Sequence, residues 1–361
     1  MQVGSVKKLS SWQDSKNWIQ EFLNAFPNSE SDLSLDLDSK HRSIIKKINS
    51  PNMGIGAISL KNLRNWSGQS DLGAPITLNY LFHNKFSNAK DIVRYFHGKT
   101  LGINSQRYLQ QSLNDDLEIL KQIGAYDLLS QNPIDSTPGE TLWVSDGVAR
   151  YNMRWLRYVY LAHRIKSKSM LPQNGTWMDI GSFYGGLQSI VKKNNPSAKF
   201  IMVDFYHQLF RSYVYLKNLF PQSNHLLGLN PGQKIPNDSF VYIPVQEYSN
   251  LPDLKIDLST NFFSFGEMPR NYFESYINSS AMLNSQLIYT VNRVVSNPFF
   301  EPTYDTDLTV LDYRFKGFDI QSFDIFPMHH FQRIKREFFG TKNYRNISSS
   351  YFELFAINTK K

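Results

Sequence analysis

Two aspartates and a group of glycines in the middle of the chain have the types and order needed to hold a polar small molecule. Asp179 precedes a segment that contains Gly181 and Gly185, and Asp204 closes the next apolar run. Glycine has no Cβ, so the backbone there can turn tightly and approach a ligand. An acidic residue at the end of a neighbouring strand can accept hydrogen bonds from ribose hydroxyls. These residues predict a binding site for a nucleotide-like cofactor.

The elements that must position these residues are indicated by short apolar runs that alternate with helical runs from residue 176 onwards. This alternation predicts an α/β domain, a parallel sheet with helices on both faces. The carboxyl ends of its strands would bring the glycine segment and both aspartates together. The alternative is an ordinary tight turn with two surface aspartates. The expected strands are 176–180, 199–204, 240–245, 255–263, 286–295 and 351–358, and the expected helices are 185–193, 207–220 and 271–283.

Composition limits the classes of function. The chain has 361 residues, of which 41% are hydrophobic and 14% aromatic, and this excludes a disordered protein. The absence of cysteine excludes a disulfide framework, a thiolate zinc site and a cysteine nucleophile. A formal charge of +8 admits nucleic acid, a membrane surface or an anionic substrate as partner. No apolar run is long enough for a membrane span and no signal-peptide core is present, so we expect a soluble cytoplasmic protein.

The length favours two domains. Residues 1–140 are expected to form a mainly helical cap or oligomerisation region, in which four leucines share one helical face, and a homodimer is a possible consequence. A turn cluster at 132–139 separates this region from a cofactor-binding domain at 141–361. The four leucines are Leu109, Leu113, Leu117 and Leu120.

The glycine segment resembles the first motif of S-adenosylmethionine-dependent methyltransferases, written acid–x–Gly–x–Gly–x–Gly, with Phe183 in place of the middle glycine. It does not match the dinucleotide fingerprint G-x-G-x-x-G, which disfavours a nicotinamide dehydrogenase. The resemblance implies a Rossmann-like class I methyltransferase sheet and S-adenosylmethionine as cofactor. It also implies that Asp204 holds the ribose, that the residues after the third strand flank the adenine, and that the end of the fourth strand lines the methionine. The implied cofactor-binding residues are Asp179, Gly181, Ser182, Phe183, Tyr184, Gly185, Asp204, Phe205, Val245, Gln246, Asn261 and Phe262.

A narrower resemblance covers roughly residues 140–361. The runs DIGSFYGGL, VDF, IDLSTNFFSFGEMP and LIYTVNR are similar to the sugar O-methyltransferase family of bacterial surface-polysaccharide gene clusters. In that family an Asn at a strand end is followed by Ser-Phe-x-Glu-Met, which here is 264–268. The resemblance implies methylation of a sugar hydroxyl, in a surface polysaccharide or in its nucleotide- or lipid-linked precursor.

Methyl transfer to a hydroxyl requires an aligned oxygen and a group that removes its proton. Glu267, which follows the fourth strand, is the first candidate for this base, and its alternative role is to cap the next helix. His329 and His330 are the second candidates, although adjacent side chains point in different directions and at most one would face the site. No metal site is expected. Asp305, Asp307 and Asp312 could hold a divalent ion, but a solvated loop is the favoured reading.

Five further residues are candidates for binding the acceptor. Tyr151 and Arg154 could grip an anionic group such as a sugar-linked diphosphate, or belong to a solvated basic helix face. Ser264, Asn292 and Arg293 lie after the fourth and fifth strands, where acceptor contacts are expected.

Two other functions stay open. The net charge and the aromatic content permit an RNA methyltransferase, but the chain has no dense Lys/Arg stripe and no Asn/Asp-Pro-Pro-aromatic motif after the fourth strand, so nucleic acid is disfavoured. A non-catalytic assembly protein on the same fold could use the helical N-terminal region as its binding surface.

Overall fold

A computed structural model of the chain describes residues 2–5, 15–27, 81–82, 89, 92, 103–135, 142–295, 308–338, 341–348 and 350–360. These residues form two compact units. The first takes in the described parts of Met1–Ser10, Ser67–Arg164 and Pro327–Ser350, and the second those of Ser11–Trp66, Ile165–Phe326 and Tyr351–Lys361. Both units draw on segments far apart in the sequence. The division into residues 1–140 and 141–361 stays a prediction.

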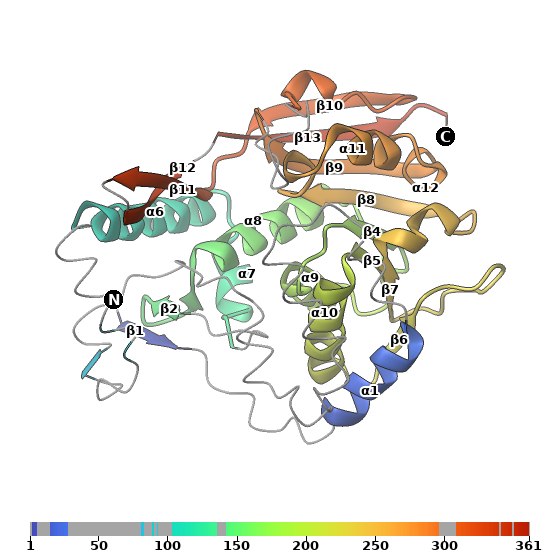
Figure 1. Ribbon diagram of the computed structural model, residues 1–361, viewed down its shortest axis with the longest axis horizontal. Coiled ribbons are helices and arrows are strands. Elements are labelled where there is room, and N and C mark those ends of the chain that lie inside the picture. Colours follow the sequence, from blue (N-terminus) through green and yellow to red (C-terminus); the bar gives the residue numbers. More distant parts are fainter. Residues whose placement is uncertain are drawn as a thin grey trace. The chain divides into compact units, whose positions relative to one another are not determined.

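The second unit is built on an eight-stranded sheet (Figure 1). Its strands are β4 (Thr176–Ile180), β5 (Lys199–Asp204), β6 (Asn224–Leu227), β7 (Ser239–Pro244), β8 (Ile256–Phe262), β9 (Ser285–Arg293), β10 (Phe318–Ile325) and β13 (Tyr351–Asn358). They lie in the order β10-β13-β9-β8-β4-β5-β7-β6. The strands from β9 to β6 in this order are parallel, whereas β13 runs antiparallel to β9 and to β10.

This topology confirms the expected Rossmann-like α/β fold, in which parallel strands form the core of a sheet with helices on both faces. Each expected strand is present within a residue or two of its expected bounds. The short β6 and the edge strand β10 were not expected, because neither carries a clear apolar run in the sequence. The chain passes from β4 to β5 on one side and returns to β8 on the other, so the carboxyl ends of these neighbours form one edge of the sheet.

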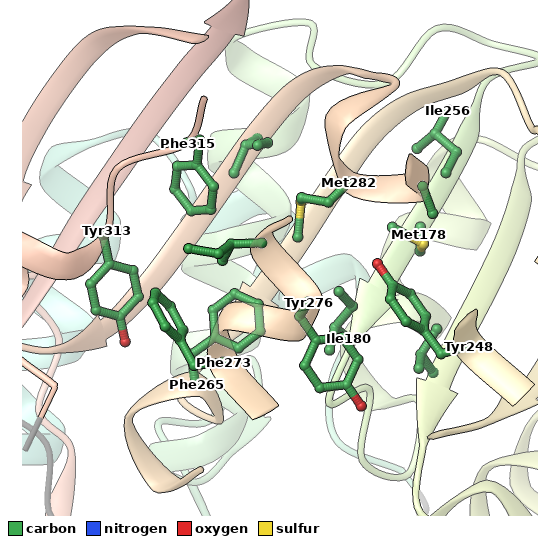
Figure 2. Packing of buried hydrophobic residues seen from close by; sticks show 14 of the residues in the cluster. Met178, Ile180, Tyr248, Ile256, Phe265, Phe273, Tyr276, Met282, Tyr313 and Phe315 are labelled. Atoms are coloured by element: carbon green, nitrogen blue, oxygen red, sulfur yellow. The ribbon is translucent and has the colours of Figure 1, made fainter. Parts of the chain in front are cut away.

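Helices cover both faces of this sheet. They are α9 (Gly186–Asn194), α10 (Tyr206–Leu219), α11 (Arg270–Ile277) and α12 (Ser280–Leu283). Side chains alternate between the faces along a strand. Tyr242 of β7 accordingly packs on Tyr213 of α10, with ring centroids 5.3 Å apart, whereas its neighbours Val241 and Ile243 join a core cluster on the opposite face. In Figure 2, residues of α11 and α12 such as Phe273 and Met282 gather in that cluster.

The helix α1 (Ser15–Ala25) belongs to the second unit although it comes from the N-terminal region. Phe22 is fully buried, and its ring lies 5.0 Å from that of Tyr206 and 5.4 Å from that of Phe210, both on α10. An ion pair between Glu21 and Lys217, at 2.6 Å, also joins the two helices. Burial of this aromatic ring fixes α1 to the helix that follows Asp204.

The first unit combines helices with two small sheets. Its strands β1 (Gln2–Ser5), β2 (Leu142–Ser145) and β3 (Arg150–Tyr151) form one antiparallel sheet, and β11 (Phe331–Phe338) pairs with β12 (Thr341–Ser348). Its helices are α6 (Ile103–Gln122), α7 (Tyr126–Gln131) and α8 (Met153–Ser167), the last of which continues past Arg164. Leu113, Leu117 and Leu120 are buried on one face of α6, as expected, while the side chain of Leu109 lies outside the described residues. None of the helices in the described ranges is long and apolar enough to cross a membrane.

Candidate functional site

The loop between β4 and α9 has an unusual backbone. Gly181, Phe183 and Gly185 all adopt positive φ angles, of 80°, 53° and 83°. This left-handed conformation costs little for glycine and more for a residue with a Cβ. Phe183 therefore takes the backbone shape of the glycine that it replaces in the motif, and the loop keeps the turn that the motif predicts.

The glycines are needed for contacts within the protein. A Cβ on Gly181 would lie 2.1 Å from Ser264 Oγ, and a Cβ on Gly185 would lie 2.7 Å from a methyl group of Leu216 on α10. Both distances are too short for real atoms. The sequence predicts open backbone that faces a ligand here, but the absent Cβ atoms at these two positions make room for neighbouring loop and helix atoms.

The carboxylate of Asp204, at the end of β5, is held on both sides by backbone N–H groups. Phe183 N donates to Asp204 Oδ2 and Phe205 N donates to Asp204 Oδ1, each at 2.7 Å. The loop after β4 thus fixes the acid that ends β5. The two N–H groups together orient both oxygens of this carboxylate.

Asp179, in contrast, lies inside the sheet. Its Oδ1 accepts a hydrogen bond from Thr260 Oγ1 and its Oδ2 accepts one from Gln188 Nε2, both at 2.5 Å, and Trp177 Nε1 donates to Thr260 Oγ1. Burial raises the pKa of Asp179 to about 7, although these two hydrogen bonds lower it, and the charge of Asp204 raises it further. This buried network joins β4, β8 and α9, which indicates that Asp179 organises the loop.

The other candidates for cofactor contact lie at the same edge of the sheet. Val245 and Gln246 begin the 3₁₀ turn η4 (Val245–Asn250) directly after β7. Phe262 ends β8 and is buried, with its ring 5.1 Å from that of Tyr289. The carboxyl ends of β8, β4, β5 and β7, which are consecutive in the sheet, thus carry all twelve predicted residues. Ser182 and Tyr184 are buried within the loop after β4, where Tyr184 packs edge-on against Tyr215.

Two buried amides link the ends of β8 and β9. Asn261 Nδ2 donates to Ile180 O at 2.7 Å and to Ser264 Oγ at 2.6 Å, and Asn292 Nδ2 donates to Asn261 Oδ1 at 3.0 Å. Asn292 Oδ1 accepts from Gly266 N at 3.2 Å. These amides and Ser264 therefore shape the turn η5 (Phe265–Glu267), and direct contact with a substrate stays a prediction for Asn292 and Ser264.

The structure pairs the first candidate base with a candidate for acceptor binding. Arg293 Nη2 donates to Glu267 Oε1 at 2.6 Å, and Arg293 Nε donates to the Tyr351 hydroxyl at 2.9 Å. The Arg293 side chain is only 9% exposed, whereas that of Glu267 is 33% exposed. Glu267 thus reaches the surface of the second unit beside a buried guanidinium, near the ends of β8 and β9.

The remaining candidates belong to the first unit, which also contains a residue that the sequence reasoning missed. His329 Nδ1 lies 2.7 Å from Asp116 Oδ1, and the same oxygen accepts from His329 N at 2.9 Å. The hydrogen bond and charge of Asp116 raise the pKa of His329, and burial raises the pKa of Asp116 itself. A buried carboxylate that orients an imidazole is typical of general bases. His330 follows at the end of the same segment and is half-buried.

Tyr151 and Arg154 lie in β3 and at the start of α8. Tyr151 is fully buried, and burial raises the pKa of its hydroxyl. Arg154 is half-buried, and its neighbour Arg157 is buried and donates to His329 O at 3.0 Å. This part of α8 is therefore not the solvated basic face that the sequence also allowed. A contact of Tyr151 or Arg154 with an acceptor stays a prediction.

No group of three His, Asp or Glu side chains within the described ranges is arranged to hold a metal ion. Asp305 and Asp307 lie outside those ranges. Asp312 accepts a hydrogen bond from Arg270 at 2.7 Å and from Thr309 N in a capping box.

Three polar residues of these networks, Thr260, Gln188 and Asp116, were not among the candidates from the sequence. Thr260 offered no distinct signal, because it is one of four polar residues among the seven of β8. Asp116 is separated from His329 by most of the chain, so no local pattern could connect them.

Comparisons with known proteins give only distant similarities. No protein-family model matches the chain, and no curated protein matches it. Among solved structures, it is similar to a candidate RNA methyltransferase from Pyrococcus horikoshii, with 11% identity, a TM-score of 0.37 and coverage of 56% of this chain and 82% of that one. The chain is also similar to magnesium protoporphyrin IX methyltransferase from Synechocystis, with bound S-adenosylmethionine. The identity is 12%, the TM-score is 0.37, and the match covers 57% of this chain and 79% of that one. A third similar structure is an S-adenosylmethionine-dependent methyltransferase from Aquifex aeolicus. The identity is 11%, the TM-score is 0.33, and the match covers 55% of this chain and 89% of that one. These values carry no argument about activity, and the fold assignment rests on the strand order of the sheet.

Proposed function

We propose that this chain is an S-adenosylmethionine-dependent O-methyltransferase that methylates a sugar hydroxyl. The observation that carries the proposal is the link between the loop after β4 and the acid after β5, in which Phe183 N donates to Asp204 Oδ2. The link puts a left-handed, glycine-rich turn and a fixed carboxylate side by side at the edge of a parallel sheet. This is the arrangement that binds the ribose of a nucleoside.

The described residues fit the chemical parts of this donor. Asp204 would accept hydrogen bonds from the two ribose hydroxyls. Val245 and Gln246, after β7, would flank the adenine, and Asn261 and Phe262, at the end of β8, would line the methionyl part. The donor supplies a methyl group on a sulfonium centre. The buried amides at the ends of β8 and β9 hold these segments rigid, which lowers the entropic cost of alignment.

Glu267 is the proposed base. In the reaction the acceptor oxygen forms a bond to the methyl carbon, the bond between that carbon and sulfur breaks, and the hydroxyl proton passes to the base. Glu267 Oε1 is fixed by Arg293 beside the carboxyl end of β8, on the same edge of the sheet as Asp204. The assignment of His329 and His330 as alternative bases stays a prediction from the sequence. A sugar acceptor is supported by the family resemblance of residues 264–268 and of the runs around them.

Calorimetry tests the donor. The wild-type protein should bind S-adenosylmethionine and not NAD, and Asp204→Ala should weaken binding by at least about tenfold, because hydrogen bonds to a charged group contribute roughly 1.5–3 kcal/mol. Asp319→Ala is the matched control, since Asp319 is an exposed aspartate on β10. Binding that Asp204→Ala leaves undisturbed would overturn the assignment of the site.

Mass spectrometry tests the acceptor. The protein is incubated with S-adenosylmethionine and, separately, with nucleotide sugars, surface glycans and RNA. A mass increase of one methyl group on a sugar supports the proposal. Methylated RNA, together with strongly salt-dependent RNA binding, would replace the sugar by a nucleic acid. Donor binding without any methylated product would favour a non-catalytic role.

A further inference from the structure

Phe183 places a bulky side chain where the backbone favours glycine. Its φ of 53° falls in the left-handed region that Gly181 and Gly185, on either side of it in the loop, also adopt. A glycine at this position would remove the steric strain. Strained residues of this kind concentrate at binding and catalytic sites, where surrounding contacts hold them in place. The contacts of the Phe183 ring therefore show which part of the site the strained conformation supports.

The ring connects the loop after β4 to α10. The guanidinium carbon of Arg211, a buried residue of α10, lies 5.5 Å from the ring centroid, within the range of a cation–π interaction. The ring also packs edge-on against Tyr184 at 5.1 Å, and Tyr184 packs against Tyr215 of α10 at the same distance. The loop is thus anchored to the helix that begins two residues after Asp204.

The backbone of the same residue acts on Asp204 directly. Phe183 N donates to Asp204 Oδ2 at 2.7 Å, and Phe205 N holds the other oxygen at the same distance. A left-handed residue turns its N–H in a direction that an ordinary extended or helical residue at this point would not. The anchored ring and the directed N–H therefore both serve to fix the orientation of one carboxylate.

We propose that Phe183 is a positioning residue for the ribose of the donor, in which the ring, held by Arg211, keeps the loop in the conformation that orients Asp204. The inference rests on the proposed function, because it assigns Asp204 to the ribose hydroxyls. The side chain compensates for the missing middle glycine by replacing conformational freedom with a fixed anchor on α10. Preorganisation of this kind increases affinity by reducing the ordering cost of binding.

The test compares substitutions that keep the left-handed backbone but lose the ring. Phe183→Gly and Phe183→Asn both tolerate positive φ, so the fold should persist. We expect both to bind S-adenosylmethionine about tenfold more weakly in calorimetry, the size of a desolvated cation–π contact. The melting temperatures of the two variants should stay close to that of the wild-type protein although their donor affinity falls, because the relief of backbone strain offsets the lost packing of the ring. Phe183→Tyr keeps the aromatic ring and should retain the wild-type affinity for S-adenosylmethionine.

Two further variants connect the effect to Asp204 and separate it from strain. Ser169 has a φ of 50° at an exposed position between α8 and β4, so Ser169→Gly relieves similar strain and should leave donor affinity unchanged. In an Asp204→Asn background, Phe183→Gly should cause a much smaller loss than it does alone, because residues that act through each other are not additive.

The outcomes separate the two proposals. If the wild-type protein binds S-adenosylmethionine but Phe183→Gly binds it equally well, the positioning role is overturned and the proposed function stands. The positioning role is also overturned if the affinity losses of Phe183→Gly and Asp204→Asn are fully additive, or if Phe183→Tyr does not retain wild-type affinity. If the wild-type protein binds no S-adenosylmethionine, the proposed function fails, and the positioning role fails with it.

Discussion

The guanidinium of Arg293 holds the carboxylate of Glu267 at 2.6 Å, in an ion pair whose cation is almost entirely buried. The pair therefore fixes the direction of the Glu267 carboxylate beside a buried positive charge. A role of Glu267 as base and a role as the anchor that keeps Arg293 in place predict different kinetics.

If Glu267 is the base, Glu267→Gln should reduce the methyl-transfer rate by roughly 10²- to 10⁴-fold, the usual contribution of general base catalysis. Donor affinity measured by calorimetry should not change. Arg293→Lys, which keeps the charge near Glu267, should retain more activity than Glu267→Gln. If the two variants lose activity equally, Glu267 acts as an anchor for Arg293.

The contact between Gly181 and Ser264 gives a second prediction. Gly181→Ala should destabilise the protein by at least about 2 kcal/mol, since it combines a left-handed alanine with an atomic overlap. Gly232→Ala is the matched control, because Gly232 has a similar φ of 75° but no heavy atom within 4 Å of the added Cβ. Chemical denaturation should show a smaller loss for Gly232→Ala, and Ser264→Gly should partly rescue Gly181→Ala. Equal losses in both alanine variants would show that only backbone strain matters.

The buried carboxylate of Asp179 predicts a pH dependence of stability. Its pKa is about 7 in the folded protein, against an ordinary value of 3.8, and burial is the main cause. Between these values the unfolded chain releases the proton first, so the free energy of unfolding should fall as the pH rises from about 4 to about 7. The loss should reach about 4 kcal/mol. Asp179→Asn should remove this loss, because the Gln188 amide can rotate to accept from it. Parallel pH profiles of the two proteins would contradict the buried titration.

The Asp116–His329 pair predicts a measurable titration. The hydrogen bond that His329 donates to Asp116 raises the pKa of His329 above 6.5. Its stabilising contribution is therefore present below pH 6.5 and is lost as the pH rises through the folded value. Asp116→Asn keeps an oxygen acceptor but removes the charge, and should lower the pKa of His329. NMR can follow the titration of the His329 imidazole, and its resonance is assigned as the one that disappears in His329→Gln. An unchanged titration in Asp116→Asn would show that Asp116 does not control the imidazole.

Local sequence patterns predicted the elements of the second unit well. The runs at 176–180 and 199–204 became β4 and β5, since apolar segments this short between turn residues are typical of strands in a sheet covered on both faces. The position of Asp204 at a strand end also followed from its place in the chain. These features depend on residues close together in sequence, which is where periodicity carries information.

Tertiary structure decided what each candidate contacts. The sequence placed Glu267 after a strand and Arg293 after another, but only the pairing of β8 with β9 brings them together. Likewise, the position of α1 against α10 depends on burial of Phe22 among aromatic residues that lie far along the chain.

The sequence by itself determined the α/β architecture, the glycine-rich turn and the acids at the ends of β4 and β5. The tertiary structure decided that Asp179 is an internal organiser, that backbone N–H groups hold both oxygens of Asp204, and that Phe183 reproduces the turn of a missing glycine. The physical reason is that periodicity reports which face of an element is buried. Hydrogen-bond partners, pKa values and backbone strain depend instead on which distant atoms fill the space around each side chain.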